Sequence, residues 1–160
     1  MTRKDRKYVL GFGAVCGVFG IACGIVVAIM AAQNPDYRYF FVPAGVSAFV
    51  TGAFNWWFFI VRTSTLSLRR AIVAGALAGI GGHYICWLLI FWGAWGASKA
   101  GLFSLHSVFD PVNAVWGTAV LTFWSLVLMG WITVPGGAML GGMFAAMQQK
   151  LETAKASSSP

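Results

Sequence analysis

Four long apolar runs constrain this chain more than any other feature, because each can cross a bilayer as a helix. They cover residues 8–32, 39–61, 71–97 and 112–147, and none of them contains a charged residue. A spanning helix needs about 20 mainly apolar residues, and backbone polar groups in hydrocarbon must bond within their own segment, which favours helices. We therefore predict an all-α integral membrane protein, a four-transmembrane-helix bundle forming one membrane domain over 1–160.

Composition excludes the main soluble classes. Only 9% of the residues are charged, whereas a water-soluble domain carries about a quarter. The net charge of +7 comes from short basic clusters between apolar runs, and a nucleic-acid interface needs a folded basic surface. We expect a lipid bilayer as the main partner and no nucleic acid.

The distribution of Lys and Arg predicts the orientation. With four crossings, nine of the eleven basic residues fall on one side, in segment 1–7, in the connection between the second and third spans, and in segment 148–160. The positive-inside rule then places both termini in the cytoplasm, in a multi-pass protein that we assign to a bacterial inner membrane. Basic residues at this surface also attract anionic lipid headgroups: Arg3, Lys4, Arg6, Lys7, Arg62, Arg69 and Arg70.

The fourth run is too long for one straight crossing. As a straight helix, 112–147 would measure about 54 Å, against a hydrocarbon core of about 30 Å. We expect one long helix, or one kinked near Pro135, because proline interrupts helical hydrogen bonding. The connection 98–110 is rich in apolar residues, so we expect it to lie on the outer membrane surface.

Small residues form a stripe on each of two predicted helices. At about 100° per residue they share one face, and small residues allow close helix packing in lipid. This stripe can pack the bundle internally or contact a second copy or a partner subunit, and both interpretations stay open. The glycines are Gly13, Gly17, Gly20, Gly24, Gly75, Gly79 and Gly82.

Polar side chains within the apolar runs are the candidates for a functional path. Such groups can bond across helices or line a route for a solute. An ionisable residue such as His83, deep in a span, is a functional hypothesis by default, as a bonded neutral imidazole or as a gating group. The candidates are Ser47, Thr51, Asn55, His83, Thr122 and Ser125.

Several kinds of chemistry lack their residues. No Asp or Glu lies in the four runs, which removes carboxylate-driven antiport and paired-carboxylate hydrolysis. The three cysteines are expected inside the spans, without the spacing of a metal or redox motif. We expect no metal, no cofactor and no assembled catalytic site.

The sequence favours a non-enzymatic accessory or assembly subunit that acts through glycine-lined helix packing. The first alternative is a small oligomeric channel or transporter with a polar path along 39–61. The second is an intramembrane enzyme that acts on a lipid or a quinone.

Overall fold

The computed structural model describes residues 2–34, 37–101 and 111–157, and this part of the chain is built from helices. Helix α1 (Arg3–Met30) is followed by α2 (Phe41–Trp56), which continues as the π-helical turn η2 (Trp57–Val61), by α3 (Leu68–Lys99) and by α4 (Pro111–Ser157). Four spans are long and apolar enough to cross a membrane. The prediction of an all-helical structure with four helices able to span a membrane is confirmed. Most of the expected surface connection 98–110 lies outside the described residues.

Helix α1 begins before the apolar run because its first turn is capped. Thr2 Oγ1 accepts a hydrogen bond from the Asp5 backbone N–H at 3.2 Å, and Asp5 Oδ2 accepts one from the Thr2 N–H at 2.8 Å. This reciprocal pair satisfies two N–H groups that a helix end would leave unbonded. The basic N-terminal residues therefore extend the helix.

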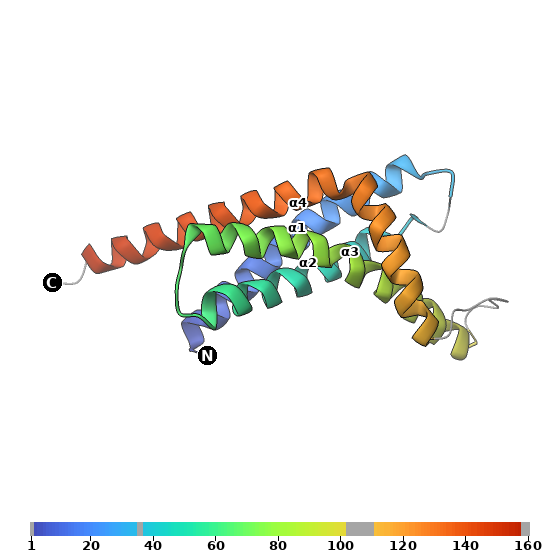
Figure 1. Ribbon diagram of the computed structural model, residues 1–160, viewed down its shortest axis with the longest axis horizontal. Helices are drawn as coiled ribbons and strands as arrows, with labels where there is room; N and C mark the ends of the chain where they lie inside the picture. The colour runs from blue at the N-terminus through green and yellow to red at the C-terminus, as the bar shows by residue number, and fades with distance from the viewer. Residues whose placement is uncertain (1, 35–36, 102–110, 158–160) are drawn as a thin grey trace.

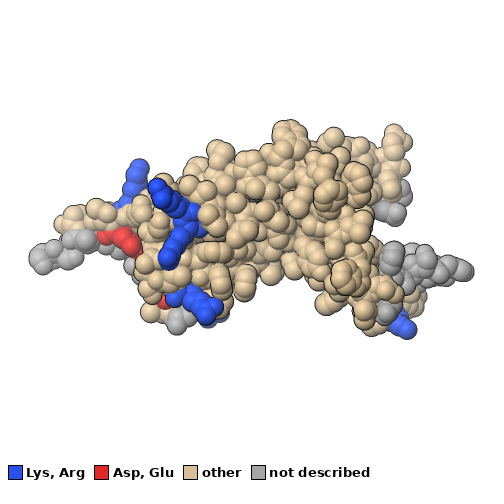
Figure 2. Space-filling view, in the orientation of Figure 1, with Lys and Arg blue, Asp and Glu red and all other residues tan. Residues whose placement is uncertain are grey.

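The helices pack as two pairs. Helix α1 lies along α2, α3 lies along α4, and α2 against α3 joins the pairs. The start of α1, the end of α4 and the α2–α3 connection all lie at one end of the molecule (Figure 1). On the face drawn in Figure 2, most Lys and Arg side chains gather at that end, and the long middle section carries none. We call this end the basic end.

The glycine stripe of α1 faces α2 along its whole length. A Cβ at Gly20 would lie 2.6 Å from the Ala44 carbonyl oxygen, and one at Gly24 would lie 2.5 Å from the Phe41 Cα. Gly13 and Gly17 meet α2 nearer the basic end, both against Phe49. These contacts bring the two backbones close together, as small residues allow in lipid.

The second stripe divides between two neighbours. A Cβ at Gly75 would collide with the Gly137 carbonyl of α4, and one at Gly79 would lie 2.6 Å from the Thr133 carbonyl oxygen. Gly82 instead faces α2, where a Cβ would lie 3.7 Å from Thr51 Oγ1. All seven predicted packing glycines therefore lie at contacts within the chain.

An aromatic cluster fills the bundle at the basic end. The ring centroids of Phe12 and Trp56 are 4.4 Å apart, and Phe144 of α4 lies 5.5 Å from Phe12 and 5.0 Å from Trp56. Phe12 and Trp56 have no exposed surface. The cluster links α1, α2 and α4, and it closes this end of the bundle.

Helix α4 is long and bent. It has 47 residues with Pro135 in its interior, and a straight helix of that length would reach about 70 Å. Figure 1 shows it changing direction in its orange part, which contains Pro135. Proline has no N–H, so the Trp131 carbonyl loses its partner four residues on, and the ring crowds that carbonyl. Most helix–helix contacts of α4 are with α3.

Candidate functional site: a cavity between the helix pairs

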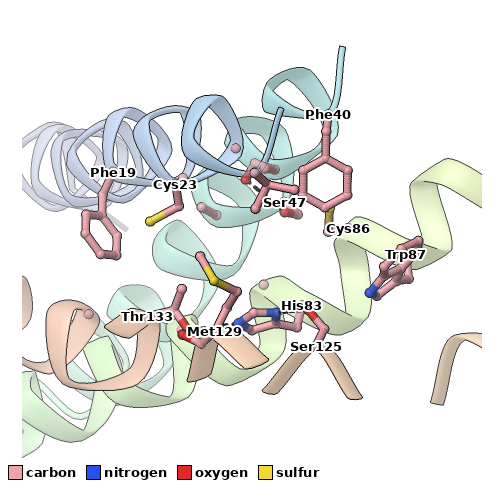
Figure 3. A pocket seen from close by; sticks show the side chains of 18 of the residues that line it. Phe19, Cys23, Phe40, Ser47, His83, Cys86, Trp87, Ser125, Met129 and Thr133 are labelled. Carbon is pink, nitrogen blue, oxygen red and sulfur yellow. Dashed lines mark hydrogen bonds between the residues drawn. The ribbon is translucent and has the colours of Figure 1, made fainter. Parts of the chain in front are cut away.

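Beyond the aromatic cluster the two helix pairs enclose a cavity of about 560 Å³. All four helices contribute to its wall (Figure 3). The lining is mostly apolar, and the described residues in it include no charged side chain. Met30, Trp124 and Leu128 line the cavity and are also exposed on the surface. The cavity is therefore only partly enclosed, and its most exposed lining residues lie on α1 and on the first part of α4.

His83 of α3 is the main polar group in the wall, and it bridges two hydroxyls of α4. Its Nδ1 lies 2.6 Å from Ser125 Oγ, and its Nε2 lies 2.8 Å from Thr133 Oγ1. Figure 3 shows the imidazole between these two side chains at the edge of the cavity. The two hydroxyls are eight residues apart in α4, so His83 joins two points of that helix to α3 just before Pro135.

The hydrogen-bond network favours one arrangement of protons. Thr133 Oγ1 donates to the Met129 carbonyl oxygen at 3.2 Å, so its lone pairs are free to accept from His83 Nε2–H. Ser125 then donates its hydroxyl proton to Nδ1. A neutral imidazole supplies one donor and one acceptor, and both are used. In this arrangement both ring nitrogens of a neutral His83 are hydrogen-bonded.

The polar face of α2 is bonded to backbone. Thr51 Oγ1 donates to the Ser47 carbonyl oxygen at 2.8 Å and lies 3.2 Å from the Ala78 carbonyl oxygen of α3. Ser47 Oγ donates to the Ala44 carbonyl oxygen at 2.9 Å, and Asn55 Nδ2 donates to the Thr51 carbonyl oxygen at 2.8 Å. Only Ser47 of these three lines the cavity. These contacts suit packing between α2 and α3.

The remaining predicted residues lie apart from the cavity. Thr122 is on α4, where its buried Oγ1 has no hydrogen-bond partner in the described structure, and it is absent from the lining. Arg3, Arg6, Lys7, Arg62, Arg69 and Arg70 are exposed, and the side chain of Lys4 lies outside the described part. Of the candidate path residues, the structure thus brings Ser47, His83 and Ser125 to the cavity wall and leaves Thr51, Asn55 and Thr122 outside it.

The cavity has no donor set for a metal ion. Over residues 2–34, 37–101 and 111–157, no three His, Cys, Asp or Glu side chains gather as a metal site would need. The three cysteines are unbridged, and all three line the cavity. With one imidazole, a few hydroxyls and a mainly apolar wall, the arrangement suits an apolar molecule better than an ion.

Sequence reasoning missed Thr133, Gly137 and Gly141, which carry the α3–α4 contact. A Cβ at Gly141 would collide with the Ala71 carbonyl of α3. The signal was present: Thr133, Gly137, Gly141 and Ala145 recur every four residues and so share one helix face. Because these residues lie near Pro135, the sequence of this region is interpreted as a kink rather than as a packing face.

Comparisons of the chain with protein-family models, with curated proteins and with solved structures find no match.

Proposed function

We propose that this protein is a non-enzymatic membrane subunit that holds a lipid-like molecule in the cavity between its helix pairs. The observation that carries the proposal is the uncharged, mainly apolar cavity of about 560 Å³, whose most exposed lining residues lie on α1 and on the first part of α4. Small-molecule sites measure about 300–1,000 Å³ and combine apolar walls with a few polar groups. The His83 network supplies the polar group, and the bilayer supplies molecules of this chemistry at the opening.

The proposal includes an orientation. We infer that the basic end faces the cytoplasm of a bacterial inner membrane, because lysine and arginine concentrate there (Figure 2) and the positive-inside rule applies to such short segments. Both termini then lie in the cytoplasm. Labelling of single introduced cysteines from each side of the membrane tests this, and termini labelled from opposite sides would contradict it.

A fluorescent polyene fatty acid tests the cavity. Trp87 and Trp124 line it, so a bound polyene should accept their excitation energy in a saturable way. We expect Gly82→Leu to weaken binding at least tenfold, because Gly82 lines the cavity and a Cβ there meets only ordinary contacts.

Gly93→Leu is the matched control, because a Cβ at Gly93 has nothing within 4 Å and the residue does not line the cavity. It should bind the probe as the unmodified protein does. Equal loss in both variants, or no saturable transfer in the unmodified protein, would contradict the proposal.

The enzymatic alternative is favoured by one observation, the contact between Ser125 Oγ and His83 Nδ1 at 2.6 Å. A serine beside a base that a third group orients is the arrangement of a nucleophilic catalyst. Ser125 Oγ would attack an ester carbonyl carbon while its proton passes to Nδ1 and then to the departing alcohol. Water would release the acyl group. A fluorophosphonate that labels the protein, but not Ser125→Ala, would support this second candidate.

We rank it second because oxyanion stabilisation is usually a large part of acyl-transfer catalysis. The described lining holds no cation, and Ser125 lies inside a helix whose backbone N–H groups bond internally. The channel alternative has less support, since the polar groups of α2 are bonded to backbone carbonyls. An accessory role beside a partner or a second copy stays a prediction, which the oligomeric mass in mild detergent tests.

A further inference from the structure

A second pocket lies at the basic end, between η2 and the first turns of α3. It measures about 620 Å³, and its polar lining consists of Arg62, Thr63, Arg69 and Arg70. Its apolar wall includes Phe58 and Val73. We propose that this pocket binds an anionic phospholipid, with the headgroup phosphate among the three arginines and an acyl chain along the apolar wall. The site is separate from the cavity, and the proposal does not depend on the cavity's function.

The positive charge of this pocket lacks compensation from its own lining, because no described residue there is acidic. Arg69 and Arg70 also lie in the first turn of α3, where the helix dipole is positive and cations are unfavourable. Ser67, at the N-cap, makes no side-chain capping bond. The pocket therefore combines three guanidinium groups with the uncapped, electropositive end of a helix, and an anion would relieve this repulsion.

Local contacts hold two of the arginines at the rim. The guanidinium carbon of Arg62 lies 5.4 Å from the centre of the Phe58 ring, and Arg70 donates a hydrogen bond to Thr65 Oγ1. Each guanidinium has five N–H donors in a planar fork that suits phosphate oxygens. Holding the side chains in advance reduces the entropy lost when the anion binds.

The apolar wall favours a phospholipid over free phosphate. Phe58 and Val73 are 38% and 45% exposed, and Val73 lies about one turn further along α3 than the arginines. A phosphate ion would use only the arginine rim. A phospholipid would use both parts, with its chain beside the span and its headgroup at the membrane surface.

Native mass spectrometry of the full chain in a neutral detergent tests the proposal. The probes are dioleoyl phosphatidylglycerol, which is anionic, and dioleoyl phosphatidylcholine, which carries the same phosphate and chains but no net charge. We expect at least fivefold more bound phosphatidylglycerol. The variant Arg62→Gln/Arg70→Gln should remove that preference while its thermal unfolding temperature stays near that of the unmodified protein.

The matched control is Arg3→Gln/Arg6→Gln, which removes the same charge at the same end but outside the pocket. It should keep the preference for phosphatidylglycerol. Equal loss in both variants would mean undirected attraction and would overturn the proposal. Displacement of the lipid by millimolar inorganic phosphate would identify a site for soluble anions and would also overturn it.

Discussion

The two ends of this bundle differ in how the space between the two helix pairs is filled. At the basic end, three large rings fill the space between helices, and Phe144 connects α4 to α1 and α2. Toward the other end, the part of α4 before the bend turns away from the bundle (Figure 1), and the space between the helix pairs stays open as the cavity. Without a hydrophobic force between helices in lipid, contact geometry decides where they join. Glycine contacts join the helices within each pair in both halves, whereas the large rings fill the space between the pairs at the basic end alone, and the other half stays available to a ligand.

The largest effect is expected from Gly75→Leu. A side chain there would collide with the Gly137 carbonyl, and backbone cannot move aside as a flexible side chain can. The loss should exceed the about 1–3 kcal/mol typical of overpacking, measured as the free energy of unfolding in mild detergent during titration with SDS. Gly93→Leu, on the same helix with open space around it, should change stability little. Equal losses would mean that the contact does not hold the α3–α4 pair.

Phe144→Ala should have the next largest effect. Phe144 is 8% exposed and touches both other rings of the aromatic cluster, so its removal should cost about 3 kcal/mol. Met143→Ala is the control, because Met143 is 66% exposed. The folded fraction of Phe144→Ala, prepared at low temperature, should still bind the polyene probe in the cavity. If binding fails in the folded variant, the two halves are not independent.

Thr133→Val should cost about 1 kcal/mol, the scale of an interhelical hydrogen bond in a membrane. The substitution keeps the shape of the side chain and removes the partner of His83 Nε2. Thr122→Val should be neutral or stabilising, because the Thr122 hydroxyl has no hydrogen-bond partner in the described structure. Unfolding midpoints for this pair of variants measure the difference directly. A larger loss for Thr122→Val would argue against the His83 network.

Asn55→Leu should have the smallest effect, within about 0.5 kcal/mol. The Asn55 amide bonds to a carbonyl of its own helix, and the residue does not line the cavity. Probe binding should be unchanged, and proteoliposomes should show the same ion flux with either protein. An ion flux that Asn55→Leu abolishes would support the channel alternative instead.

The number and kind of helices could be predicted from the sequence because membrane thickness imposes a length on every apolar run. Gly20 and Gly75 could be identified as packing residues because their spacing follows the helical period. Which helix each glycine would meet could not be deduced, since Gly13 to Gly24 and Gly75 to Gly82 have the same small-residue character. Pairing depends on the shape of the whole bundle.

The cavity was harder to foresee than the helices. The cavity depends on the bend near Pro135 and on the direction of that bend. The sequence indicates the position of the proline but does not indicate the direction. Phe144 is one apolar residue in a long apolar run, so nothing marked it as the ring that closes the basic end. His83 was selected for its ionisable side chain, whereas its partners Ser125 and Thr133 depend on the packing of α3 against α4.

The helical hydrogen bond that is missing at Pro135 divides α4 into two segments. The segment after the proline meets α3 at Gly137 and Gly141 and faces Phe19 of α1 at Gly136, whereas the segment before it is bonded to α3 through His83. A bilayer that becomes thinner or thicker forces spanning helices to change their tilt. The segment before Pro135 can follow such a change by turning at the proline. The bundle would then adapt to its host lipid by altering the width of the cavity, while the close glycine contacts stay intact.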